Sequence, residues 1–177
     1  MKIFIVSALI SISSLFTVSI YTHHYTAVSG EEISMSQYQG KKILLVNIAT
    51  EDAKAAVQIP QLEQLYQLYK DSLVVIGFPS NDFGDETRTD NEIKLLMQNT
   101  YHAVFPVSAR IGVKDSTGST HPLYSWLQHK SENGSMDIKL SKNFQKILVD
   151  KNGSVIAFFG STVEPMASAI QNAIKNN

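Results

Sequence analysis

The sequence predicts an α/β fold in which a mixed central sheet is flanked by helices. Two apolar runs, KILLVNI at 42–48 and SLVVIGF at 72–78, have the composition of strands buried on both faces, and a helical pattern lies between them. Two further apolar runs, at 144–149 and 155–159, flank Asn152-Gly153, which is a strong hairpin signal. Parallel strands followed by an antiparallel hairpin and a last helix make a mixed sheet.

Composition limits the classes of function. The chain has 177 residues, 44% of them hydrophobic and 18% charged, which suits one globular domain with a sizeable core. The formal net charge is -1 without a basic stripe, so no nucleic-acid partner is expected. The sequence contains no cysteine, which excludes thiol catalysis, disulfides, a cysteine-ligated zinc and a lipoprotein anchor on cysteine.

The N-terminus differs from the rest of the chain. Lys2 precedes residues 3–20, which carry no charge and have the pattern of a signal peptide. No clean A-x-A cleavage site stands before Tyr25, so an uncleaved membrane anchor remains the alternative. We therefore assign residues 1–24 to a signal peptide or N-terminal membrane anchor and 25–177 to the domain, with the folded part starting near Ala27. The protein is expected to be exported, periplasmic or secreted, or else anchored.

The first half of the domain predicts a βαβ unit. Pro60 suits the first turn of a helix. The apolar positions that follow Val57 at helical spacing are Ile59, Leu62, Leu65, Tyr66 and Tyr69. Because a strand precedes this helix and another follows it, a right-handed crossover between parallel strands is expected.

The middle of the chain contains three more signals. Thr89 followed by Glu92 is a capping box, and it predicts a helix whose apolar face includes Ile93, Leu96, Met97 and Tyr101. Residues 104–113 suggest another strand. Pro122 is placed for the first turn of a short helix.

The last helix is predicted from a second capping box, Ser161-x-x-Glu164, with Pro165 early in the helix. Its apolar face consists of Met166, Ile170, Ala173 and Ile174. The complete order, in which helices alternate with strands before a hairpin and a closing helix, fits a thioredoxin-like fold.

Several blocks of the sequence resemble one family. They are SGEEISMSQYQGKKILLVNIAT, GFPSNDFG at 77–84, NEIK at 91–94, TYHAVFPV at 100–107, HPLY at 121–124 and NFQKILVDKNG at 143–153. Each block, and the order in which they occur, resembles the glutathione peroxidases over roughly residues 29–175. The resemblance implies a glutathione-peroxidase-like version of the thioredoxin-like fold.

The resemblance also implies positions for an active site. In that family a cysteine or selenocysteine after the first long strand attacks the peroxide, and a Gln, a Trp and an Asn surround it. Counted from NIAT, the nucleophile position falls on Asp52; counted back from Leu62-Glu63, it falls on Ala53. The Gln falls on Asp82, the Trp on Lys142 and the Asn on Asn143, the one position of the four that keeps its residue type.

These substitutions predict that the protein is not a thiol peroxidase. A carboxylate lacks the soft lone pairs of a thiolate and has no sulfenic state through which to cycle. If the family geometry holds, Asp52, Asp82 and Lys142 approach one another and form a charged cluster. Alternatively, all three side chains solvate the surface.

Three classes of function remain. The first is a binding or regulatory protein on a degenerate peroxidase scaffold, with a small-molecule or protein partner of unknown identity. The second is a peroxidase or oxidative-stress protein by family membership. The third is a repurposed enzyme that uses Asp52 and Asp82, with a carboxylate as general base. Acidic residues 51, 52, 82, 85 and 86 offer oxygen ligands without EF-hand spacing, so neither a metal nor a cofactor is expected.

Overall fold

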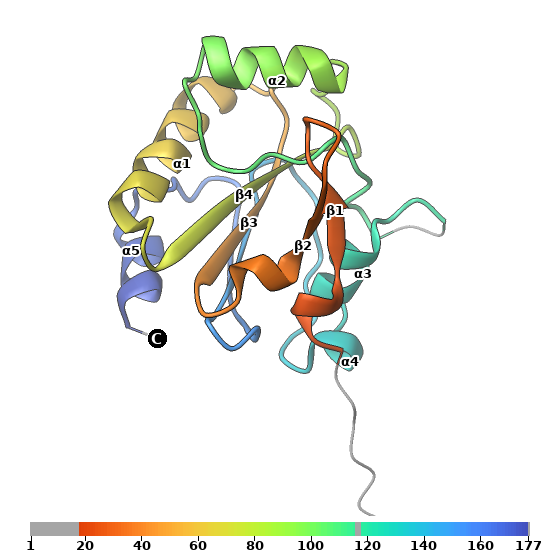
Figure 1. Ribbon diagram of the computed structural model, residues 1–177, viewed down its shortest axis with the longest axis vertical. Coiled ribbons are helices and arrows are strands. Elements are labelled where there is room, and N and C mark those ends of the chain that lie inside the picture. The colour runs from red at the N-terminus through yellow and green to blue at the C-terminus, as the bar shows by residue number, and fades with distance from the viewer. Residues whose placement is uncertain (1–17, 116–117, 177) are drawn as a thin grey trace, which may run out of the picture.

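The computed structural model describes residues 18–115 and 118–176 (Figure 1). Most of the apolar run predicted to be a signal or an anchor lies outside the described residues. Within the described ranges, no helix combines the length and the apolar character that crossing a bilayer requires.

The central sheet has four strands in the order β4-β3-β5-β6 (Figure 1). Strand β3 runs parallel to β4, and β5 is antiparallel to β6, as the sequence predicts. Strand β5 also pairs antiparallel with β3. Strands β1 and β2 form a separate hairpin. The elements in chain order are η1 (Ile20–Thr22), β1 (His24–Thr26), β2 (Glu32–Ser34), η2 (Met35–Tyr38), β3 (Lys42–Ile48), α1 (Ala55–Tyr69), β4 (Leu73–Pro79), α2 (Asp90–Asn99), α3 (Pro122–Gln128), α4 (Lys130–Asn133), β5 (Lys146–Val149), β6 (Val155–Phe159) and α5 (Ser168–Lys175).

Both faces of the sheet are covered. Alternate residues of β3 point to opposite faces, so Leu45 joins the core under α3 and the β1-β2 hairpin, whereas Leu44 joins the core under α1, α2 and α5. Every residue of β3 and of β4 is buried. This two-sided burial explains why both strands are continuous apolar runs in the sequence.

The strand predicted at 104–113 is wrong. This segment makes only isolated bridges, Gly77 with Val107 and Ala27 with Ser108. Pro106 accepts a hydrogen bond from Gly77 N at 2.9 Å but has no N–H to donate. A proline in the middle of the run therefore prevents a regular ladder along β4.

Two helix starts differ from the prediction. The capping box at Thr89 is confirmed, but the last helix begins at Ser168 rather than after Ser161, because other elements occupy the backbone of 161–164. The carbonyl of Ser161 accepts from Gln58 Nε2, and that of Val163 accepts from Lys146 Nζ. Helix α1 begins at Ala55, ahead of Val57, so Pro60 lies beyond its first turn.

The described fold begins ahead of the domain start predicted at residue 25. Ile20 is fully buried in the core under α3. Trp126 Nε1 donates to Val18 O at 2.6 Å, and the Tyr21 hydroxyl donates to Lys151 O at 3.0 Å. Residues 18–24 are therefore part of the packed domain.

A chain that starts at residue 25 is expected to be less stable than one that starts at residue 18. It loses the burial of Ile20, worth about 1.5–3 kcal/mol, and leaves the indole N–H of Trp126 without its partner. Urea unfolding of the two chains measures the difference, expected at about 2–4 kcal/mol. Equal unfolding midpoints would contradict the structural role of residues 18–24.

Candidate functional site

The candidate site lies at one edge of the sheet, around residues 50–54. This turn follows the carboxyl end of β3, and the loop after the parallel strand β4 lies beside it. Strand β5 runs the opposite way, so the segment that leads into β5 reaches the same edge. Three loops that are distant in sequence therefore converge at the place where α/β folds usually bind ligands.

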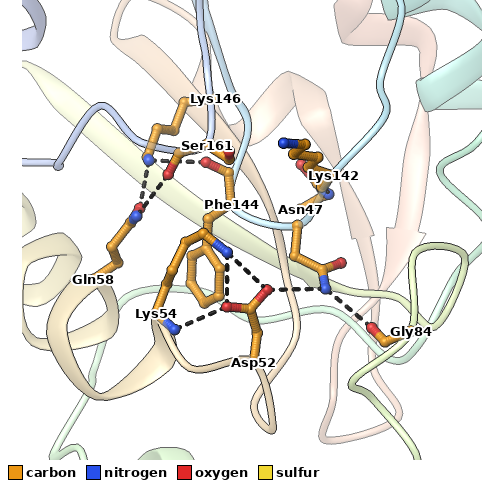
Figure 2. Close-up of polar contacts among 10 residues, drawn as sticks. Asn47, Asp52, Lys54, Gln58, Gly84, Lys142, Phe144, Lys146 and Ser161 are labelled. Atoms are coloured by element: carbon orange, nitrogen blue, oxygen red, sulfur yellow. Dashed lines mark hydrogen bonds and ion pairs between the residues drawn. The ribbon is translucent and has the colours of Figure 1, made fainter.

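The Asp52 carboxylate is held by donors from its own turn and from the β5 side (Figure 2). Its Oδ1 accepts from Lys54 N at 2.8 Å and from Lys54 Nζ at 3.0 Å. Its Oδ2 accepts from Lys54 Nζ at 3.2 Å and from Asn143 Nδ2 at 3.3 Å. Only 8% of the Asp52 side chain is exposed, so these donors largely replace water.

Asn143 connects the turn with the loop after β4. Its side chain lies 3% exposed, and Nδ2 donates to Gly84 O at 3.0 Å as well as to Asp52. The Oδ1 atom is buried without a hydrogen-bond partner among the described residues. One amide thus joins all three loops while keeping a free acceptor beside Asp52.

Asp52 is ionised at neutral pH. Partial burial acts to raise its pKa, but the hydrogen bonds from Lys54 and Asn143, together with the Lys54 charge, hold the pKa below its ordinary value. An anion with a lowered pKa and occupied lone pairs is a weak base. The site therefore presents a fixed negative charge rather than a proton acceptor.

Two neighbouring acids fasten the loop after β4 to the turn. Glu51 Oε2 accepts from Thr87 N and from Thr87 Oγ1, each at 2.7 Å, and these bonds lower its pKa. Glu86 is fully buried, and its carboxylate accepts from Thr50 N at 2.6 Å and Thr50 Oγ1 at 3.0 Å. Burial raises the pKa of Glu86 despite these bonds. Both acids act as clamps between the two loops.

The cluster expected from Asp52, Asp82 and Lys142 does not form. Asp82 Oδ2 accepts from the backbone amides of residues 113 and 114, which draw it away from the turn. Lys142 contributes its backbone, whose carbonyl accepts from Asn47 Nδ2 at 2.9 Å, while its side chain is exposed. The cation that pairs with Asp52 is Lys54, a residue that the sequence analysis did not select. Asp52 and Asn143 are the two predicted site residues that meet.

A buried lysine lies behind the turn. Lys146 is fully buried at the start of β5, and its Nζ donates to Gln58 Oε1 and to Phe144 O at 2.9 Å (Figure 2). It also donates to Val163 O at 2.6 Å. Burial lowers its pKa to about 7, because all three acceptors are uncharged. The strand pattern gave no sign of this arrangement, since two of the three acceptors come from α1 and from the loop before α5.

An open groove of about 300 Å³ adjoins the turn. Its lining includes Lys54 and Glu164, together with Ala53 and Gln58. Ala53, the alternative nucleophile position, therefore faces a groove without a reactive group of its own. Across the described residues, no three His, Asp or Glu side chains come together as a metal site would require.

Replacing Asp52 with Asn is expected to lower the free energy of unfolding at pH 7 by about 1–2 kcal/mol. The new NH₂ would face the donors of Lys54 or Asn143. Because the folded-state pKa of Asp52 is lowered, its contribution is present above its ordinary value of 3.8 and is lost as pH falls through the folded-state value. Wild type and variant should therefore converge in acid unfolding below about pH 4. The exposed Asp71→Asn is the control, and a constant difference at all pH values would contradict the assignment.

Lys146 makes stability depend on pH in the alkaline range. Between its folded-state pKa of about 7 and its usual 10.5, the unfolded chain binds more protons, so the free energy of unfolding rises with pH. The slope approaches about 1.4 kcal/mol per pH unit from this residue. Denaturant unfolding of Lys146→Met between pH 7.5 and 9.5 should show the slope reduced, whereas the exposed Lys139→Met should keep it. An unchanged slope in Lys146→Met would refute the assignment.

Known proteins match this chain along most of its length. The family model for glutathione peroxidase matches residues 20–128. A glutathione peroxidase of Lactococcus lactis subsp. cremoris is 35% identical over 147 residues, which cover 82% of this chain and 91% of the relative. The crystal structure of Trgpx in its apo form superposes with a TM-score of 0.66 at 33% identity, over 90% of this chain and 97% of that one.

A more distant structure shows the fold alone. A thioredoxin-family thiol:disulfide interchange protein of Chlorobium tepidum superposes with a TM-score of 0.61 at 16% identity, over 89% of this chain and 93% of that one. The thioredoxin-like architecture predicted from the sequence is thereby confirmed. With its family model matched over more than half of its residues and its relatives aligned nearly end to end, the chain belongs to the glutathione peroxidase family, as a divergent member without cysteine.

Proposed function

We propose that this glutathione-peroxidase-like protein lacks thiol peroxidase activity and serves as a binding or regulatory protein. The observation that carries the proposal is that the chain has no cysteine, and that the turn where the family resemblance places the nucleophile, at Asp52 or Ala53, holds the Asp52 carboxylate. Peroxide reduction requires a group that gives two electrons to oxygen and is then reduced by a thiol. A carboxylate does neither.

The geometry supports binding over a new carboxylate-based reaction. A general base works best when its pKa lies near the working pH and a lone pair faces the substrate. Asp52 has a lowered pKa and donors on both oxygens. Asp82, the other carboxylate of the enzyme hypothesis, is occupied by backbone amides. Neither residue has the properties of a catalytic base.

The groove beside Ala53 is the proposed binding surface. Its lining contains one cation, Lys54, which also pairs with Asp52, and one anion, Glu164, which accepts from Gln61 Nε2 at 2.8 Å. A lining with both charges suits a small polar molecule, or a protein segment, that carries both signs. The ligand would lie over the turn that holds Asp52, so the fixed anion would contribute to selecting it.

The proposal includes export. The uncharged run at 3–20 has the pattern of a signal peptide or of an uncleaved anchor. Because Ile20 is packed in the core and Val18 O binds Trp126, any cleavage would fall ahead of residue 18, or the run would be retained. Either route delivers the domain outside the cytoplasm with residues 18–24 intact.

A hydroperoxide assay with a thiol reductant tests the peroxidase part of the proposal. The wild-type protein, purified metal-free, should show no turnover above buffer. Asp52→Cys should gain slow peroxide consumption, because the Lys54 ammonium and the Asn143 amide would stabilise a thiolate at that position. Asp52→Ser, of similar size but without a thiol, is the matched control. Wild-type turnover with glutathione or thioredoxin would overturn the proposal.

A further inference from the structure

A lysine-lined hollow lies at the end of the sheet opposite Asp52. Its volume is about 310 Å³, and three lysines from three elements line it: Lys42 at the start of β3, Lys151 in the β5-β6 turn and Lys175 at the end of α5. Strand β3 separates it from the Asp52 turn by about 20 Å, from the rise per residue of an extended chain. The hollow is therefore a separate feature from the candidate site.

Lys42 is a buried cation that lacks an anionic partner among the described residues. The exposed fraction of Lys42 is only 6%. Its Nζ donates to the carbonyls of Ile174 and Ala173, the latter at 3.4 Å, at the C-terminal end of α5. An ammonium has three protons to donate, so one remains after these two bonds. Buried charges are normally paired, because removing an isolated charge from water costs on the order of several kcal/mol of desolvation free energy.

The other walls of the hollow are fixed. The carbonyl of Lys151 accepts from the Tyr21 hydroxyl, and the turn that carries Lys151 is closed by Asp150 Oδ1, which accepts from Asn152 N at 2.9 Å and Ser154 N at 2.8 Å. The Asp150 carboxylate is therefore hydrogen-bonded within its own turn. The long exposed side chains of Lys151 and Lys175 rise from anchored backbone around the buried Lys42.

We propose that this hollow binds a small phosphorylated molecule. Three lysines around one concavity match the several oxygens and the double negative charge of a phosphate group, for which lysine acts as a point-charge partner. The carboxylates of the described chain do not line the hollow, so the charge of the lysines is available to a ligand. The volume lies at the lower end of the range for small-molecule pockets.

The surroundings of the phosphate group follow from the same residues. The Ser72 and Tyr69 side chains also line the hollow, and the Tyr69 hydroxyl donates to Gln171 Oε1 at 3.1 Å, which fixes the ring as a wall. Burial lowers the pKa of Lys42, which the Asp150 charge opposes. A bound dianion would also oppose this lowering, so binding is expected to favour the protonated form of Lys42.

Calorimetric titration with inorganic pyrophosphate, at constant ionic strength, tests the site. Saturable one-to-one binding is expected. The double variant Lys151→Gln/Lys175→Gln should weaken it by about tenfold or more, because two charge-assisted contacts are lost. The matched control Lys130→Gln/Lys139→Gln removes the same charge from exposed positions elsewhere and should change the affinity by less than about twofold.

Three outcomes would overturn the proposal. They are absence of saturable binding to the wild-type chain, equal weakening by both double variants, and binding to vesicles that contain phosphatidic acid without binding to free pyrophosphate. The second would show a general charge effect, and the third a membrane surface in place of a small molecule. Because both double variants change exposed side chains, each is expected to keep the wild-type unfolding midpoint, which circular dichroism checks.

Discussion

The site is built around one constraint: an anion at position 52 must be surrounded by donors that come from two loops. Lys54 supplies a backbone N–H and an ammonium from the turn itself, and Asn143 supplies an amide from the segment before β5. The same amide donates to Gly84 O, so the loop after β4 is held by the group that holds Asp52. Removing the anion would leave the partly buried Lys54 donors without their acceptor and would reduce the Asn143 amide to its bond with Gly84 O.

Two lysines of this protein stand at the start of a strand and donate hydrogen bonds to oxygens of other elements. Lys146 begins β5 and donates to backbone and amide oxygens of α1 and the loop before α5, while Lys42 begins β3 and donates to the last carbonyls of α5. In each case the ammonium satisfies oxygens that regular secondary structure leaves unpaired. The two differ in exposure to a cavity: Lys42 lines a hollow, and Lys146 is enclosed. Only the first arrangement leaves room for a ligand.

The fold could be predicted from local patterns, and much of the site could not. Buried strands β3 and β4 are continuous apolar runs, and the Thr89 capping box is complete within four residues, so each signal is local. The pairing of Asp52 with Asn143 was expected through the family resemblance. The position of the Asp82 side chain was not expected. Its Oδ2 accepts from backbone amides about thirty residues further along the chain, and no sequence motif encodes such a contact. Lys146 was missed for the same reason, since Gln58 is 88 residues away in sequence.

The geometry around Asp52 is compatible with the proposed loss of peroxidase chemistry from this scaffold. A thiolate and a carboxylate are both anions that accept hydrogen bonds, so the donors of Lys54 and Asn143 suit either one. Exchanging one anion for the other therefore preserves the electrostatic balance of three converging loops, whereas a neutral residue would leave buried donors unpaired. Under the proposal, such an exchange would remove the ability to give electrons to a peroxide. Stability and reactivity are thus separable at this position, because the first depends on charge and the second on sulfur or selenium.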